Sequence, residues 1–172
     1  MPGRGSDDHP VVVVDSREQR PYAFKARRVT CVRRALPAGD YSLAGLETVV
    51  AVERKTLDDL VNTVIWSRGR FRRELERLRT YEASCVVVEA DLRDVLTGKY
   101  WSKAHPSSVL GAVMAIIVES GVPVFFCSNR QAARLFVERY LLRCHRRYAG
   151  QGPQKNRPQD APLVLPAQGQ QG

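Results

Sequence analysis

Short apolar runs alternate along the chain with segments whose apolar residues recur every three or four positions. Runs with few polar residues are typical of strands that are covered on both faces of a sheet, and they lie at residues 11–14, 29–32, 41–43, 48–52, 85–88 and 122–127. The helical spacing is typical of helices with one apolar face, and it covers residues 58–65, 70–81, 91–96, 107–119 and 129–146.

Alternating strands and helices predict an α/β protein in which helices flank a sheet. Pro37, Gly39 and Asp40 mark a turn, and the two strands that follow it, on either side of Gly45, predict a hairpin. A hairpin makes part of the sheet antiparallel. The expected fold class is therefore α/β, with a mixed central β-sheet flanked by helices.

Length and composition predict the domain organisation. The 172 residues suit one domain of ordinary size. We expect residues 1–10, which are polar, to be a flexible leader and residues 11–147 to form the globular domain. Residues 148–172 are rich in Gln, Pro and Gly, and we expect a disordered tail there.

The charge of the chain favours a polyanionic partner. It carries 27 Lys and Arg residues against 18 Asp and Glu residues, a formal net charge of +9. Of the basic residues, 22 are arginine, whose guanidinium group binds phosphate in a two-pronged way. The excess does not distinguish nucleic acid from an acidic protein or an anionic membrane surface. A biased genome composition would raise the arginine content equally well.

The sequence predicts neither secretion nor insertion into a membrane. The first ten residues lack an apolar core, and the longest apolar stretch, residues 109–118, has about half the length of a membrane span. The four cysteines, at positions 31, 85, 127 and 144, form no CxxC pair, which disfavours a structural zinc site. We expect a cytoplasmic protein with reduced thiols, nucleoid-associated if it is bacterial, and no membrane partner.

Acidic residues lie where the predicted strands end. Glu53 and Lys55 are two apart on one strand and therefore point to the same face. Asp40 lies in the turn that begins the hairpin, so the hairpin brings it toward Glu53. Two close carboxylates repel each other unless a cation separates them or one is protonated, and oxygen ligands suit Mg²⁺ or Mn²⁺. Asp15, at the exit of a buried strand, is either a further ligand for metal-assisted phosphodiester hydrolysis or a loop cap.

The order of these residues resembles that of a known family. Segments 13–18 (VVDSRE), 39–41 (GDY) and 52–55 (VERK), followed by Asp59, resemble the nuclease domain of the XPF family of structure-specific DNA endonucleases. The signature of that family is GD, a spacer and ERKxxxD, and the spacer here has twelve residues. Segments 69–71 (GRF), 105–106 (HP) and 121–124 (GVPV) are similar to later elements of the family. The resemblance covers residues 11–147.

The resemblance implies a restriction-endonuclease-like fold and metal-dependent cutting of one strand at branched or flapped DNA, in repair or recombination. It implies that Asp15, Asp40 and Glu53 hold Mg²⁺, or Mn²⁺ in its place. The other matching positions would act beside the metal: Lys55 on the nucleophile and transition state, Arg17 and Glu18 near the scissile phosphate, and Arg54 and Asp59 as supports of the ligands.

The helix that follows the signature is rich in arginine. Arg68, Arg70, Arg72 and Arg73 are candidate DNA contacts, because each neutralised phosphate adds to affinity. The alternative is a solvated face on which these arginines pair with glutamates of the same helix.

One family element is missing from the sequence. XPF proteins usually carry a tandem helix-hairpin-helix domain after the nuclease domain, whereas only about two dozen residues follow Arg147. We therefore expect a standalone nuclease domain, to which a partner could supply the missing grip on DNA.

Apolar residues on the last two predicted helices suit the core or a subunit contact. The helix after Pro106 is apolar on almost every side and is expected to lie in the core, with Ser107 or Ser108 as its N-cap. The final helix suits either the core or a homodimer through the C-terminal helices, and its apolar residues are Phe136, Val137, Tyr140 and Leu141.

Three aromatic residues have two possible roles. Trp66, Tyr100 and Trp101 could stack on bases at a DNA junction. Packing against the rest of the fold is the commoner role of such side chains.

Two classes of function compete. The first is an active endonuclease, and the alternative is a catalytically silent DNA-binding or dimerisation module of the same family. A silent module tends to lose its carboxylates, whereas Asp15, Asp40, Glu53 and Lys55 are all present. A scaffold for acidic proteins would explain the net charge but not these acids. The sequence therefore favours the enzyme.

Overall fold

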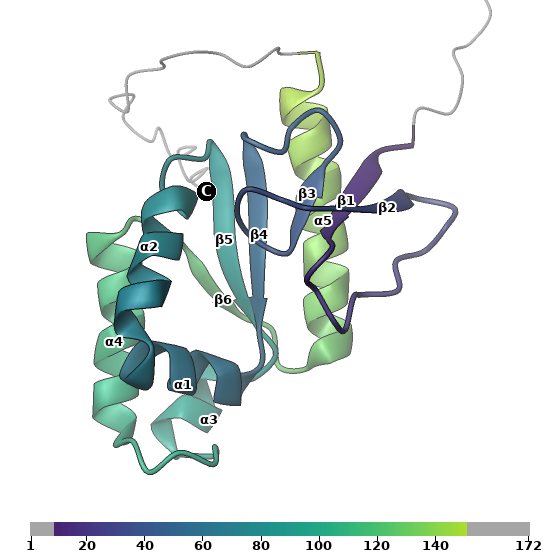
Figure 1. The fold of residues 1–172 in the computed structure, drawn as a ribbon. Helices are drawn as coiled ribbons and strands as arrows, with labels where there is room; N and C mark the ends of the chain where they lie inside the picture. Colours follow the sequence, from purple (N-terminus) through teal and green to yellow (C-terminus); the bar gives the residue numbers. More distant parts are fainter. Residues whose placement is uncertain (1–8, 151–172) are drawn as a thin grey trace, which may run out of the picture.

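The computed structural model describes residues 9–150, which form one six-stranded sheet with helices on both faces (Figure 1). The strands are β1 (Val11–Asp15), β2 (Thr30–Arg34), β3 (Tyr41–Leu43), β4 (Val50–Lys55), β5 (Ala83–Val88) and β6 (Val124–Phe126). The helices are α1 (Leu57–Trp66), α2 (Arg68–Leu78), α3 (Leu92–Leu96), α4 (Pro106–Glu119) and α5 (Arg130–Tyr148). Most of the expected leader and tail lies outside the described residues.

The sheet is mixed, as predicted. Its strand order is β2-β1-β3-β4-β5-β6. β3 runs antiparallel to both β1 and β4, while the pairs β1–β2, β4–β5 and β5–β6 are parallel. In the hairpin, Tyr41 pairs with Val52. This register places the turn before β3 beside the carboxyl end of β4.

The two faces of the sheet are covered by different helices (Figure 1). Helices α1 to α4 lie on one face and α5 lies on the other. Neighbouring residues of a strand point to opposite faces, so Ala51 packs beneath α1 and α4, whereas Val50 and Val52 pack with α5. The central strands are therefore apolar at every position along most of their length, which explains their continuous apolar runs.

Helix α4 corrects two expectations. Its N-cap is His105, whose Nδ1 accepts a hydrogen bond from the backbone N–H of Ser107 at 3.3 Å. Neither serine is the cap, because Pro106 takes the first helical position, where its fixed φ and missing N–H are favourable. Only one face of the helix is buried, and Val118 is 78% exposed. No helix within residues 9–150 has the length and apolarity needed to span a membrane.

Helix α5 uses its apolar residues inside its own chain. Val137 and Leu141 are buried against the sheet, and Phe136 and Tyr140 are half-buried beside them. These four residues, which we considered for a homodimer contact, therefore cover the second face of the sheet. Val137 and Leu141 are therefore not accessible to a second subunit, whereas a dimer contact through the exposed parts of Phe136 and Tyr140 stays a prediction.

Candidate active site

The turn before β3 fixes Asp40 against two strands. The Asp40 backbone N–H donates to the Val52 carbonyl at 2.8 Å, and the Asp15 N–H donates to the Asp40 carbonyl at 2.8 Å. The Asp40 carboxylate accepts a hydrogen bond from the Arg54 backbone N–H at 2.8 Å. Gly39 has φ of 73°, and a Cβ there would lie 2.9 Å from the Val52 carbonyl oxygen. Glycine is therefore required at this position for the close approach of the turn to β4.

The end of β4 places a carboxylate and an ammonium group on one face of the sheet. Glu53 and Lys55 point the same way because they are two apart on the strand, and the Lys55 Nζ lies 2.9 Å from the Glu53 Oε1. Both side chains are about nine-tenths buried. The ammonium group also lies 4.9 Å from the centre of the Phe71 ring on α2, a favourable cation–π distance. Lys55 is thus held in one position as a charged group.

Burial and mutual repulsion disfavour the ionised forms of the two central acids. Burial raises the pKa of Asp40 to about 6, although the hydrogen bond from the Arg54 N–H lowers it. Burial, followed by the charge of Asp40, raises the pKa of Glu53 well above its ordinary value. Burial alone would lower the pKa of Lys55, but the charge and hydrogen bond of Glu53 raise it. If both acids were ionised, they would carry more negative charge than Lys55 alone balances.

Asp15 has a different environment from the other two acids. Its carboxylate accepts two hydrogen bonds from the Arg17 guanidinium, at 2.8 and 2.9 Å, and one each from the backbone N–H groups of Arg17 and Leu36. The side-chain hydrogen bond from Arg17 lowers the pKa of Asp15 to about 2, against the effect of burial. Asp15 is thus ionised and already paired with a cation.

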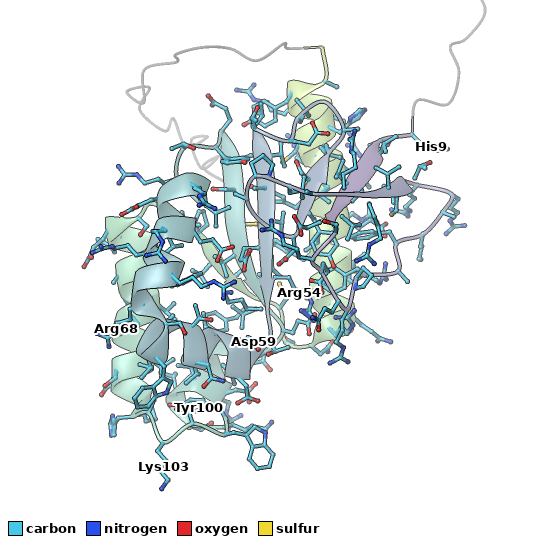
Figure 2. All side chains as sticks on the ribbon, in the orientation of Figure 1. His9, Arg54, Asp59, Arg68, Tyr100 and Lys103 are labelled. Carbon is cyan, nitrogen blue, oxygen red and sulfur yellow. The ribbon has the colours of Figure 1, made fainter. Side chains whose placement is uncertain are left out.

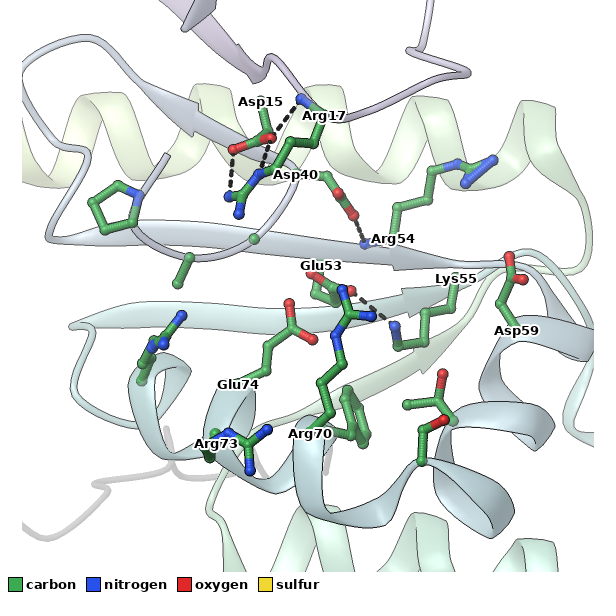
Figure 3. A pocket seen from close by; sticks show the side chains of 17 residues that line it. Asp15, Arg17, Asp40, Glu53, Arg54, Lys55, Asp59, Arg70, Arg73 and Glu74 are labelled. Carbon is green, nitrogen blue, oxygen red and sulfur yellow. Dashed lines mark hydrogen bonds and ion pairs between the residues drawn. The ribbon is translucent and has the colours of Figure 1, made fainter. Parts of the chain in front are cut away.

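A fourth carboxylate, Glu74 of α2, joins this group (Figure 3). It points toward Glu53 across the cavity, and its negative charge contributes to the raised pKa of both Asp40 and Glu53. The sequence prediction gave Glu74 no role in the site, because only the arginines of this helix were considered as contacts. The signal was present, because position 74 follows the buried Phe71 by three residues and precedes the buried Leu75. Residues three or four apart on a helix share a face.

These side chains line a cavity of about 610 Å³ between the sheet and α2 (Figure 3). Nine predicted site residues line it, namely Asp15, Arg17, Asp40, Glu53, Arg54, Lys55, Asp59, Arg70 and Arg73. The sequence analysis left out two charged residues that also line it, Glu74 and Arg77. The cavity thus combines buried carboxylates with a rim of arginines.

Two of the predicted DNA contacts on α2, Arg68 and Arg72, do not line the cavity. Arg68 donates from Nε to the Val64 carbonyl at 2.9 Å, and Arg72 forms an exposed ion pair with Glu76 at 3.7 Å. Both arginines line a separate groove between α2 and α4. They differ from Arg70 because successive helical residues are rotated by about 100° around the axis. The helix thus presents arginines on two sides, of which one faces the cavity.

The Arg54 guanidinium lies among acids at one edge of the site. Its Nε donates to Glu89 at 3.0 Å, and it lies 3.8 Å from the carboxylate of Glu18. Glu89 also accepts hydrogen bonds from the Tyr22 hydroxyl at 2.8 Å and from Arg130 at 3.0 Å. Glu18 therefore points to Arg54, and its predicted role is better described as support of β4 than as contact with a phosphate.

Glu89 accepts hydrogen bonds from Tyr22, Arg54 and Arg130, but the sequence alone gave it no role in the site. It directly follows β5, and its N–H donates to the Lys55 carbonyl at 2.9 Å. β4 and β5 are parallel, so their carboxyl ends meet at the edge of the sheet where functional groups commonly gather. An acid directly after a buried strand was the signal that could have identified it.

Asp59 marks the start of α1 at the cavity wall. Its carboxylate accepts a hydrogen bond from the Thr56 hydroxyl at 2.7 Å, while its backbone N–H donates to the Thr56 Oγ1 at 3.2 Å. This reciprocal arrangement caps the helix. Asp59 thus fixes the beginning of α1 relative to the end of β4.

The donor set suits a hard divalent cation. Glu53 is buried and Asp40 is half-buried. Burial raises the pKa of each, and each is raised further by nearby negative charge, which a cation between them would offset. Carboxylate oxygens are ligands that Mg²⁺ and Mn²⁺ prefer, and Glu74 offers a further one. Within residues 9–150, no three His, Cys, Asp or Glu side chains are close enough together to hold a metal ion. Asp15 forms an ion pair with Arg17.

The raised pKa of Asp40 predicts how stability changes with pH when divalent ions are removed. Its folded value of about 6 exceeds the ordinary 3.8, so protonation favours the fold, and this stabilisation is lost as the pH rises through about 6. With chelator present, raising the pH from about 4.5 to about 7.5 should destabilise the wild type relative to Asp40→Asn, by on the order of 2 kcal/mol. Thermal melts across this range check it, and parallel pH profiles for the two proteins would contradict it.

The comparisons with known proteins agree with this geometry. A family model described as the ERCC4 domain matches residues 14–140, a range that contains every residue of the cavity. The chain belongs to the ERCC4 domain family. A relative from Methanocaldococcus jannaschii, called a putative ATP-dependent RNA helicase, is 30% identical over 120 residues, which are 70% of this chain. The chain spans only 14% of the length of that relative.

Solved structures show the same fold. XPF from Aeropyrum pernix superposes on this ERCC4 domain with a TM-score of 0.64 and 24% identity, covering 82% of this chain and 68% of XPF. XPF from Aeropyrum pernix in complex with DNA superposes with a TM-score of 0.61 and 23% identity, covering 80% of this chain and 66% of XPF. The resemblance to the XPF nuclease domain and the restriction-endonuclease-like fold are thereby confirmed.

Proposed function

We propose that this ERCC4 domain is a DNA endonuclease that depends on Mg²⁺ or Mn²⁺ and hydrolyses a phosphodiester bond at branched or flapped DNA, in repair or recombination. The observation that supports this most strongly is the convergence of Asp40, Glu53 and Lys55 in one cavity. Arginines at its rim supply charge for phosphates. Membership of the ERCC4 family and the complex of XPF with DNA support the same proposal.

The side chains of the cavity have separable tasks in this reaction. A divalent cation held by Asp40 and Glu53, with Asp15 as the third predicted ligand, would polarise the phosphate and lower the pKa of a water molecule. Lys55 stays protonated beside Glu53 and can offset negative charge as it grows on the phosphate oxygens. Arg17, at the rim, presents donors to the DNA backbone.

A silent DNA-binding module explains the carboxylates less well. Placing Asp40, Glu53 and Glu74 around one cavity costs free energy unless a cation or a proton compensates. DNA binding gains nothing from this arrangement, since acids repel phosphate. The acids are therefore better explained by chemistry at the phosphodiester bond.

A cleavage panel tests the proposal. The full chain is incubated with end-labelled flap, fork, Holliday-junction and plain duplex DNAs, with Mg²⁺, with Mn²⁺ or with a chelator. We expect single-strand cuts in the branched substrates, loss of cutting with the chelator, and recovery when the metal is added back. Tight binding without cutting under every condition would establish the silent module instead.

The two sides of α2 predict unequal roles in DNA binding. We expect the double variant Arg70→Gln/Arg73→Gln to weaken binding of branched DNA roughly tenfold and to reduce the slope of log affinity against log salt by about 2. Both arginines line the cavity. Fluorescence anisotropy titrations at several salt concentrations measure the two quantities.

The control removes the same charge from the other side of the helix. Arg68→Gln/Arg72→Gln also deletes two positive charges, but these arginines line the groove next to α4. Its salt dependence should stay close to that of the wild type. Equal effects in the two double variants would show that α2 acts only through overall charge.

We also propose a homodimer through the C-terminal helices, built on positions other than those expected from the sequence. Met114, Val118, Phe125 and Leu135 are exposed apolar residues on α4, β6 and α5. A second copy of the chain could cover these side chains and contribute a second basic surface for DNA. Analytical ultracentrifugation would show a dimer at micromolar concentration, and a Val118→Glu variant that sediments like the wild type would exclude this surface. The proposal also includes a partner protein that would supply further contacts with DNA.

A further inference from the structure

Two large aromatic side chains project into solvent. Trp66 and Trp101 are the only tryptophans of the chain, and they are 72% and 93% exposed. Tyr100, by contrast, is half-buried against the core. The two tryptophans therefore do not have the packing role that is commoner for such residues. Tryptophan left in water forgoes the large stabilisation of burial, which calls for a reason outside the fold.

Trp101 is hydrogen-bonded to the first turn of α1, next to a residue that lines the cavity. Its backbone N–H donates to the Asp58 carboxylate at 2.9 Å, and the next residue, Asp59, lines the cavity. Figure 2 shows Tyr100 and Asp59 at the same end of the molecule. The loop before α4 thus holds Trp101 near the start of α1, although Trp101 lies 46 residues after the end of β4 in the sequence (55 to 101).

Internal hydrogen bonds hold this loop in one shape. The Lys99 N–H donates to the Asp94 carbonyl at 2.8 Å, and the Tyr100 hydroxyl donates to the Ala104 carbonyl at 2.9 Å. The Ala104 N–H donates in turn to the Ser102 hydroxyl at 3.2 Å. Trp101 is therefore presented by a fixed loop, which lowers the entropic cost of binding a partner.

The chemistry around Trp101 fits a nucleobase. Lys99 and Lys103 flank it and are exposed, and Lys99 lies 3.4 Å from the carboxylate of Asp94. The loop thus combines an aromatic surface with two lysines, one of which is already in an ion pair. This combination binds single-stranded nucleic acid through base stacking and phosphate attraction. Bases inside a duplex are already stacked on one another, whereas a flap or fork offers unpaired bases close to the phosphate to be cut.

We propose that Trp101 is a stacking site for an unpaired base at the branch of the DNA substrate. The inference rests on the proposed function, which it deepens by naming the feature of the DNA that is recognised. An unpaired base seated on Trp101 would fix the branch relative to the cavity, because the backbone of Trp101 is bonded to the first turn of α1. The residue thus acts in substrate selection, at a distance from the carboxylates.

The two tryptophans allow a direct test. In Trp66→Phe, Trp101 is the only indole, and we expect its fluorescence to be partly quenched by a flap substrate but unchanged by a fully paired duplex of the same length. In a second arm, Trp101→Leu should weaken binding of the flap about tenfold while leaving duplex binding unchanged. The variant Trp66→Leu is the matched control, since Trp66 lies at the far end of α1, and a melting curve for each variant reports its folding.

The possible results distinguish failure of the stacking site from failure of the proposed nuclease. Unchanged Trp101 fluorescence in a protein that binds and cuts the flap would overturn the stacking site and leave the proposed nuclease intact. Equal losses of flap and duplex binding in Trp101→Leu would also overturn it. Quenching by the flap in a protein that cuts no DNA would uphold the stacking site while the proposed nuclease failed.

Discussion

Glu53→Gln is expected to lower the rate of cleavage of branched DNA by on the order of a thousandfold while DNA binding is kept or tightened. Glutamine has the shape of glutamate, and its side-chain oxygen can still accept a hydrogen bond from Lys55. The change therefore removes charge with little change in packing. It takes away a carboxylate that the proposed cation would use, and it removes a negative charge that repels the DNA phosphate.

The environment of Glu53 makes this variant informative about stability as well. Burial and the charge of Asp40 already raise the pKa of Glu53, so ionised Glu53 is unfavourable in the fold when no cation is present. Lys55 loses its closest counter-charge in this variant but keeps the charges of Glu74 and Asp40 nearby. The neutral variant should consequently melt near the wild type in chelator, and added Mn²⁺ should stabilise it less than the wild type. This last readout does not depend on catalysis.

Single-turnover cleavage, anisotropy binding and thermal melts measure the three effects. Glu82→Gln is the matched control, because it makes the same change of charge at an exposed position before β5. Cleavage by Glu53→Gln at a rate close to that of the control would refute a catalytic role for this carboxylate. If Asp40→Asn and Glu53→Gln both failed to fold, the acids would be structural.

The central part of the site could be predicted from the sequence because it depends on local geometry. Alternation along a strand places Glu53 and Lys55 on one face, and a hairpin of this length brings Asp40 to the same end. Both relations need only a correct assignment of the strands. The structure bears out that juxtaposition and adds the hydrogen bond between Asp40 and the Arg54 backbone.

The rest of the site depends on packing between elements that are distant in sequence. Glu74 and Arg72 look alike in a charged helix, and only the rotation of α2 against the sheet turns Glu74 into the cavity. Glu89 accepts hydrogen bonds from Tyr22, Arg54 and Arg130, which come from three other segments of the chain. The sequence left both stacking and packing open for Trp101, and its 93% exposure is known only from the structure. Local patterns place Glu74 on the helix face of Phe71 and Glu89 at the end of a strand, but they do not specify which distant residues these side chains meet.

Glu89→Gln is expected to lower the free energy of unfolding by about 3 to 5 kcal/mol. The Glu89 carboxylate is 8% exposed and contacts Arg54, which is 7% exposed, and Arg130. A neutral amide leaves the buried Arg54 guanidinium with only the carboxylate of Glu18, at 3.8 Å, as a counter-charge, and most of the cost comes from this group. Arg130 contributes less, because its side chain is 37% exposed and water can solvate it. Removing one partner of a buried ion pair costs far more than the pair contributes when it is intact.

An exposed ion pair in the same sheet is the matched control. Arg34 and Glu47 lie 2.6 Å apart, with side chains that are 54% and 27% exposed. Because solvent screens such a pair, Glu47→Gln should cost less than about 1 kcal/mol. Urea unfolding at neutral pH compares the two variants directly.

The same variant tests whether the network positions the catalytic strand. Arg54 lies between Glu53 and Lys55 on β4, so a loosened Arg54 side chain should let the end of the strand move and slow cleavage, with little change in the salt dependence of DNA binding. If Glu89→Gln were no less stable than Glu47→Gln and cut DNA at the wild-type rate, the network would be dispensable. The hydrogen bonds of the sheet and of the Asp40 turn would then be sufficient to hold Glu53 and Lys55 in place.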